Sequence, residues 1–173
     1  MKDLSELLGE ALGMEEKGWA FYKEAAEKAS NIITKKTFNF LADNEVFHIE
    51  NIKNFYYDLK DKKQLPEVDF TNKQQARADD TSIFAKNLSE LQDKIESVDD
   101  DRKACEFALD FEKNGYNFYG SMLKDTDDPS VIKLLEFLLS EEKSHYEILE
   151  GLHAYITDSH NWFMYEEGSF PQG

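Results

Sequence analysis

The sequence predicts an all-α protein: a bundle of four long helices with one long crossover that carries a short extra helix. Few helix breakers interrupt the chain, since its 173 residues include only 8 glycines and 3 prolines. Apolar residues recur at helical spacing in four long segments, and a crossover over about residues 63–98 separates the second from the third. Two helices, a long connection and two further helices form the connectivity of a four-helix bundle.

The first two segments predict a helical hairpin. Asp3 and Glu6 form a capping box, so a helix is expected from there to about Ala29. Thr34 is expected to cap the second helix, which runs to about Lys62. One stripe of this second helix carries Phe38, Leu41, Glu45, His48, Ile52 and Phe55.

The second half predicts another hairpin after the crossover. A short amphipathic helix is expected to start at Asp80 or Thr81, with apolar positions Ile83, Phe84, Leu88, Leu91 and Ile95. The third long helix is expected to open between Asp99 and Asp101 and to end near Lys124. Asp128 followed by Pro129 is typical of a helix start, and the fourth helix is expected to reach about residue 157.

These elements predict one bundle domain over residues 1–157. A tail over residues 158–173, with Trp162, Phe163 and Tyr165, is expected to pack against it.

Charge and composition exclude several classes of partner. The formal net charge of −16 argues against binding to nucleic acid or to anionic membranes, because phosphate groups would be repelled. No segment approaches the ~18 consecutive apolar residues of a membrane span, and the N-terminal residues do not resemble a signal peptide. A single cysteine, Cys105, excludes an internal disulfide and a rubredoxin-type iron site. We therefore expect a cytoplasmic protein.

The two halves of the chain repeat one pattern at an offset of 97 residues. Residues 11–22 (ALGMEEKGWAFY) align with residues 108–119 (ALDFEKNGYNFY). At the same offset, without a gap, residues 40–48 (FLADNEVFH) align with residues 137–145 (FLLSEEKSH). Each half is therefore expected to be a version of the same helical hairpin.

The repeat duplicates a set of residues suited to metal binding. The first and third helices each carry one glutamate, and the second and fourth each carry Glu-x-x-His, which places both side chains on one helical face. The six candidate ligands are Glu15, Glu45, His48, Glu112, Glu142 and His145. A single Glu-x-x-His is weak evidence, and the pair Glu150 and His153 has no counterpart in the other half. Four glutamates among apolar side chains would each cost several kcal/mol to bury unpaired, so a metal site is expected.

The ligand types favour a pair of iron ions. Glu45 and Glu142 are expected to bridge two metals, with the other four residues as terminal ligands. Four carboxylates balance two divalent cations, and oxygen-rich ligation with two imidazoles suits iron or manganese better than zinc. Two Fe ions are expected, with manganese or a mixed pair as the alternative.

Two tyrosines and two glycines lie beside these ligands in both halves. Tyr22 and Tyr119 follow Glu15 and Glu112 by two helical turns, and we expect their hydroxyls to orient ligand carboxylates. The alternative is two core tyrosines with incidental partners. Gly18 and Gly115 are explained equally well by tight helix packing and by room for peroxide or dioxygen.

The doubled E-x-x-G-x-x-F-Y and E-x-x-H motifs, over about residues 5–157, resemble the rubrerythrin family of the ferritin-like superfamily. The absence of a Cys-x-x-Cys pair makes the chain similar to the rubredoxin-free members. The resemblance implies a ferritin-like bundle whose non-haem di-iron centre reduces hydrogen peroxide in protection against oxidative stress. It also implies an external electron donor, such as a rubredoxin-type protein. We further expect a homodimer.

One position departs from the family pattern. Peroxidase-type rubrerythrins carry an additional glutamate three residues after the third-helix ligand, where this chain has Gly115. The symmetric set of four glutamates and two histidines looks more like bacterioferritin-type sites, which oxidise ferrous iron. The alternative function is therefore a ferroxidase or iron-handling protein that reacts with dioxygen. A third is a helical module whose metal is chemically idle.

Overall fold

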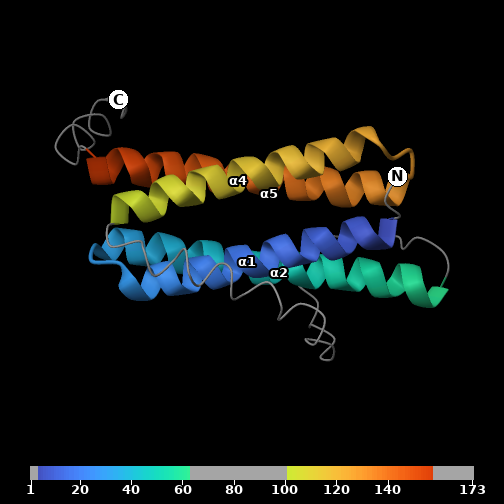
Figure 1. The fold of residues 1–173 in the computed structure, drawn as a ribbon, viewed down its shortest axis with the longest axis horizontal. Helices are drawn as coiled ribbons and strands as arrows, with labels where there is room; N and C mark the ends of the chain where they lie inside the picture. Colours follow the sequence, from blue (N-terminus) through green and yellow to red (C-terminus); the bar gives the residue numbers. More distant parts are fainter. Residues whose placement is uncertain (1–3, 63–100, 158–173) are drawn as a thin grey trace, which may run out of the picture.

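The prediction of an all-α bundle is confirmed. The computed structural model describes residues 4–62 and 101–157, and these residues form helices and no strand. The helices are α1 (Leu4–Lys28), α2 (Ile32–Lys62), α4 (Asp101–Lys124) and α5 (Pro129–Thr157). Figure 1 shows α1 and α2 as one antiparallel hairpin and α4 and α5 as a second hairpin lying along it.

Several expectations lie outside the described residues. They are the capping role of Asp3, the crossover at 63–98 with its short helix, and the tail at 158–173. The division into a bundle domain and a packed tail therefore stays a prediction.

The N-terminal caps of α2 and α5 were both predicted, and the structure differs from the prediction at the start of α2. Asp128 caps α5 as expected, because its Oδ1 accepts hydrogen bonds from the Ser130 and Val131 amides at 2.9 and 3.3 Å. The prediction that Thr34 caps α2 was wrong. The cap is Asn31, whose Oδ1 accepts from the amides of Ile33 and Thr34 at 2.7 and 3.3 Å. Thr34 lies in the first turn with its side chain buried, and Asn is at least as good a cap as Thr.

Asp101, at the start of α4, ties the two hairpins together at one end. Its carboxylate accepts hydrogen bonds from the backbone amides of Ser30 and Asn31, at 3.0 and 2.8 Å. These residues form the turn between α1 and α2. The side chain that begins the second hairpin therefore satisfies amides at the turn of the first.

The core consists of two apolar clusters, one toward each end of the bundle. One cluster includes Phe21, Phe38 and Leu149, and the other includes Ile52, Phe55 and Leu138. Burying each such side chain contributes about 1.5–3 kcal/mol. The apolar layers leave a middle section in which the buried side chains are largely ionisable.

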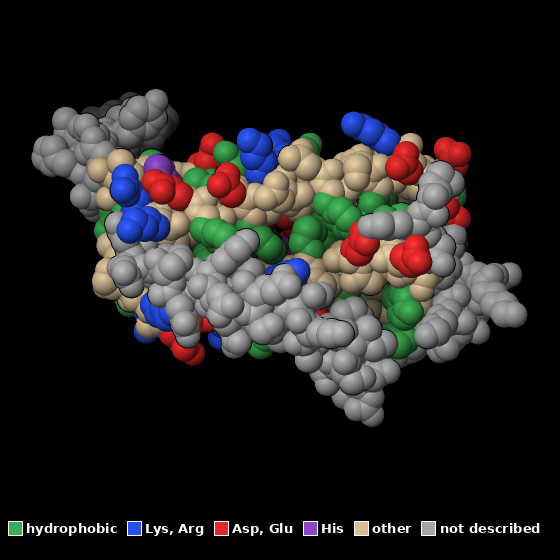
Figure 2. Space-filling view, in the orientation of Figure 1, with side chains coloured by type: hydrophobic (Ala, Val, Ile, Leu, Met, Phe, Trp, Pro, Cys, Tyr) green, Lys and Arg blue, Asp and Glu red, His purple; other side chains and the backbone are tan. Residues whose placement is uncertain are grey.

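Charged side chains lie on the surface of the hairpins. Figure 2 shows acidic and basic side chains over both hairpins and hydrophobic side chains in the seam between them. Among the described helices, none combines the length and the apolar character needed to cross a membrane.

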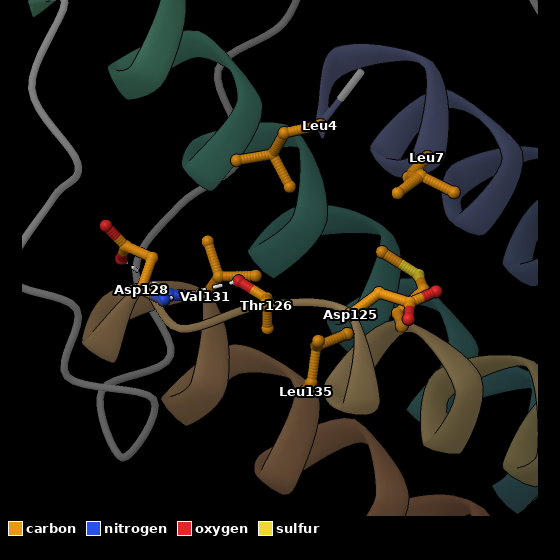
Figure 3. Close-up of a pocket in the computed structure, with 8 residues that line it drawn as sticks. Leu4, Leu7, Asp125, Thr126, Asp128, Val131 and Leu135 are labelled. Carbon is orange, nitrogen blue, oxygen red and sulfur yellow. Dashed lines mark hydrogen bonds between the residues drawn. The ribbon is translucent and has the colours of Figure 1, made fainter. Parts of the chain in front are cut away.

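A hollow of about 370 Å³ lies at the end of the bundle where α1 begins, against the turn between α4 and α5 (Figure 3). Leucines such as Leu4, Leu7 and Leu135 line it together with Asp125, Thr126 and Asp128. None of the described residues that line it is a histidine, and Val131 and Leu135 belong to the apolar cluster at this end. The hollow is therefore separate from the buried ionisable residues.

Candidate metal centre

All six predicted ligands lie together in the middle of the bundle. Each helix contributes from its inward face: one glutamate each from α1 and α4, and one glutamate and one histidine each from α2 and α5. The side chains of Glu15, Glu45, His48, Glu112, Glu142 and His145 are all at most 3% exposed. The six residues form three overlapping groups of three, and within each group the donor atoms lie within 4.8 Å of one another. These groups are Glu45–His48–His145, Glu15–His48–Glu142 and Glu112–Glu142–His145.

Both histidines turn the same ring nitrogen toward the carboxylates. His48 Nδ1 lies 3.0 Å from Glu15 Oε2 and 3.6 Å from Glu45 Oε2. His145 Nδ1 lies 3.6 Å from Glu45 Oε1 and 3.5 Å from Glu112 Oε2. The two imidazole rings stack with centroids 5.2 Å apart. Nδ1 is therefore the nitrogen of each ring that faces the place a cation would take.

The two tyrosines bond across the seam between the hairpins. The Tyr22 hydroxyl on α1 donates to Glu112 Oε1 on α4, and the Tyr119 hydroxyl on α4 donates to Glu15 Oε1 on α1. Burial raises the pKa of both phenols well above 10, and the facing carboxylates raise it further. Both hydroxyls consequently keep their protons and act as donors. Each one fixes a carboxylate of the opposite hairpin.

Close packing accounts for the two inward-facing glycines. A Cβ on Gly18 would lie 2.8 Å from a ring carbon of Phe111 and 3.3 Å from Glu45 Cδ. A Cβ on Gly115 would contact Glu142 Oε2 and lie 3.0 Å from Glu142 Cδ. The space that glycine leaves is thus filled by candidate ligand carboxylates and Phe111, which favours packing over room for an oxidant.

The close approach of the carboxylates shifts their pKa values in opposite directions. Burial raises the pKa of Glu45 and Glu142 well above 4.5, and repulsion, first of all from Glu15, raises it further. Burial acts in the same direction on Glu15, but a hydrogen bond with Glu45 and the attraction of His48 outweigh it and lower that pKa to about 2. Without a cation, Glu15 therefore loses its proton at a lower pH than Glu45 and Glu142 do.

The negative charge of Glu15 also shifts the pKa of His48. Burial lowers the pKa of its imidazole, but attraction to Glu15 and hydrogen bonds with the surrounding glutamates raise the net value well above 6.5. A cation in the cluster would replace the protons on His48, Glu45 and Glu142.

Sequence reasoning missed one carboxylate beside the cluster, that of Glu141. Its Oε2 lies 3.6 Å from His48 Nε2, and the nearby His48 imidazole lowers the pKa of the Glu141 carboxyl. Glu141 directly precedes the candidate ligand Glu142, but its counterpart at the 97-residue offset is Asn44. The comparison of halves that found the ligands therefore passed over it.

The residues fit a pair of metal ions. Among the described residues, five buried polar atoms of the cluster have no hydrogen-bond partner: Glu45 Oε2, His48 Nε2, Glu112 Oε2, and both ring nitrogens of His145. Buried polar groups without partners are uncommon and costly. Carboxylate and imidazole donors of this number suit divalent ions such as iron or manganese.

The other Glu-x-x-His pair takes no part in the cluster. Glu150 is exposed, and His153 Nε2 lies 3.5 Å from Glu106 Oε1 in a half-buried position.

A protein-family model and a solved structure are similar to this chain. The model of the protein family described as Rubrerythrin matches residues 6–153. A solved structure titled as a hypothetical protein from Pyrococcus furiosus is similar, with a TM-score of 0.64 and 23% sequence identity. The similarity covers 90% of this chain and 91% of that one, and it shows a shared fold. No curated protein matches the chain.

Proposed function

The chain belongs to the rubrerythrin family, and on that premise we propose that it is a non-haem di-iron oxidoreductase that reduces hydrogen peroxide. The observation that carries the proposal is the buried cluster of four glutamates and two histidines, in which five polar atoms lack partners. Iron bound there would supply the electrons that cleave the O–O bond. The overall reaction takes two electrons and two protons per peroxide and yields two waters.

The chain's own residues would hold the metal ions and control their surroundings. Glu45 approaches both histidines and Glu142 belongs to two of the three donor groups, so these two glutamates would hold the metal ions together with His48 and His145. Tyr22 and Tyr119 would hold Glu112 and Glu15 in fixed orientations. The apolar clusters on either side would limit the access of water.

We propose an external electron donor, such as a rubredoxin-type protein. The one cysteine of the chain, Cys105, is buried with its thiol 3.4 Å from the Leu149 carbonyl oxygen. Burial raises the pKa of this thiol to about 12, so it is a poor redox group. A homodimer and a cytoplasmic location belong to the same proposal.

One observation favours a second candidate function, that of a ferroxidase or iron-handling protein. Contact between the Gly115 position and Glu142 leaves no room for the additional glutamate that peroxidase-type relatives carry. The resulting ligand set is symmetric between the two hairpins. In this alternative Fe²⁺ is the substrate and dioxygen is the oxidant.

Stopped-flow reoxidation separates the two functions. The metal-free protein is loaded anaerobically with two Fe²⁺ per chain and mixed with hydrogen peroxide or with dioxygen. The peroxidase proposal expects much faster reoxidation by peroxide. An equal or faster reaction with dioxygen would favour the ferroxidase, and a lack of reaction with both would overturn an oxidoreductase of either kind.

Two variants test the site itself. Glu45→Ala is expected to abolish iron binding and reoxidation together, because it removes a carboxylate shared by both histidines. His153→Ala is the matched control and is expected to keep both properties. Full activity of Glu45→Ala would contradict the assignment of the site.

A further inference from the structure

The two histidines of the cluster have different surroundings on the side away from the carboxylates. His48 Nε2 faces Glu141 Oε2 at 3.6 Å. Neither Nε2 atom has a hydrogen-bond partner within residues 4–62 and 101–157. The ion-pair contacts of His145 within these residues both run through Nδ1, so its Nε2 faces no such carboxylate. At the 97-residue offset, the position of Glu141 is taken by Asn44, an uncharged side chain.

An aromatic contact adds to the difference. Phe137 packs edge-on against the His48 ring, with centroids 5.9 Å apart and an interplanar angle of 88°. Its counterpart in the repeat, Phe40, is 52% exposed. His48 therefore has a carboxylate near its Nε2 and the ring of Phe137 packed against it, whereas Phe40, the repeat counterpart of Phe137, is about half exposed.

This arrangement has a known physical consequence for a metal ligand. A histidine that binds a metal through one nitrogen usually donates its other N–H to a carboxylate or carbonyl, which fixes the tautomer and strengthens the ligand. His48 directs Nδ1 toward the cluster, so its Nε2–H is the proton available to Glu141. Glu141 can stay ionised at little cost, because its side chain is 34% exposed.

We propose that Glu141 is a positioning residue that acts through His48. It makes the His48 half of the centre bind its metal ion more tightly than the His145 half, so that the two positions fill in order. The inference rests on the proposed metal centre and adds to it an inequivalence of the two ions.

A Co²⁺ titration of the metal-free protein under anaerobic conditions tests the proposal. Calorimetry gives the two affinities, and the visible absorption of bound Co²⁺ gives the number and geometry of the sites. The wild type is expected to bind two ions in two distinct steps. Glu141→Gln is expected to weaken the tighter step by about 10- to 100-fold, the usual effect of removing such a partner, and to leave the other step unchanged.

A double-mutant cycle shows whether Glu141 acts through His48. The effect of Glu141→Gln is expected to disappear in a His48→Gln background and to persist in a His145→Gln background. Glu147→Gln is the matched control, since it removes one exposed carboxylate of α5 that faces neither histidine.

The outcomes separate this inference from the proposed function. If the wild type binds no Co²⁺, the metal centre itself is overturned. If it binds two ions with equal affinity, or if Glu141→Gln weakens both steps equally or neither, only the inequivalence is overturned. The same holds if the effect survives in the His48→Gln background.

Discussion

The hairpins α1–α2 and α4–α5 each supply one glutamate, one glutamate–histidine pair, one tyrosine and one glycine to the middle of the bundle. They match at these positions but differ at the side chains next to them. Glu141 corresponds to Asn44, and Phe111, which packs against Gly18, corresponds to Met14, which lies near Gly115.

The difference shows which positions are constrained by both hairpins at once. Each tyrosine bonds a glutamate of the other hairpin, and Glu45 approaches histidines of both. A change at such a position disturbs both halves together. Residues such as Glu141 and Asn44 lie at the margin of the cluster, where the two halves can differ without breaking it.

The largest effect is expected when one of the two equivalent glycines, Gly115, is replaced. Gly115→Ala places a methyl group against the Glu142 carboxylate, so we expect loss of two-ion binding. Overpacking should also reduce the free energy of unfolding of the metal-free protein by about 1–3 kcal/mol. Metal titration and urea unfolding measure the two effects.

Gly120→Ala on the same helix is the control for this variant. Within residues 4–62 and 101–157, its Cβ would meet only Leu139 Cδ2, at 4.0 Å, and alanine stabilises a helix by up to about 1 kcal/mol over glycine. Unchanged metal binding by Gly115→Ala would mean that Glu142 moves away from the glycine without loss.

The next effect tests the crossed tyrosines. Tyr22→Phe removes the hydrogen bond to Glu112, and Tyr119→Phe removes the bond to Glu15. Each is expected to weaken metal binding by about 10- to 100-fold. Because the bonds cross between hairpins, Tyr22→Phe should couple to Glu112→Gln and not to Glu15→Gln in a double-mutant cycle of Co²⁺ affinity. Coupling to Glu15 instead would contradict the crossed arrangement.

A smaller effect concerns pH. The pKa values of Glu45 and Glu142 are raised above 4.5 and that of His48 above 6.5, so metal binding must release protons. Each released proton raises the metal affinity by about tenfold per pH unit over the pH interval below the raised pKa values, where the group is still protonated. A pH-indicator dye would count the protons. Affinity independent of pH over this interval would contradict the assignment.

The stability of the metal-free protein should fall both as pH rises and as pH falls toward 2. Groups with a raised folded-state pKa stabilise the fold below their ordinary value, and this contribution is lost as pH rises through the raised value. Glu15, whose pKa is lowered to about 2, contributes above 4.5 and loses that contribution as pH falls toward 2. Thermal unfolding across pH would record both limits.

The smallest effect compares the two helix caps, which lie at equivalent positions of the repeat. Asn31→Ala and Asp128→Ala are each expected to cost about 1 kcal/mol, since each removes a side chain that accepts two amide hydrogen bonds. Urea unfolding of both variants checks the equality. A negligible cost for Asn31→Ala, with Thr34 taking over the role, would restore the predicted boundary.

The helices and the candidate ligands were accessible from the sequence because both depend on periodicity. The error at Thr34 was avoidable, since the offset of 97 that aligns the ligands also aligns Asn31 with Asp128. Glu141 was not accessible in this way, because its role depends on a residue of another helix, His48, and its repeat counterpart is uncharged.

The sequence by itself determined the fold class, the duplicated hairpin and the six buried donors, because helical spacing fixes which side chains share a face. Only the tertiary structure decided that Tyr22 bonds Glu112, that Glu142 fills the space beside Gly115, and that Glu141 lies behind His48. These relations depend on how the two hairpins and their helices are set against one another. Such packing is determined by the combined fit of many side chains, and no local pattern of residues encodes it.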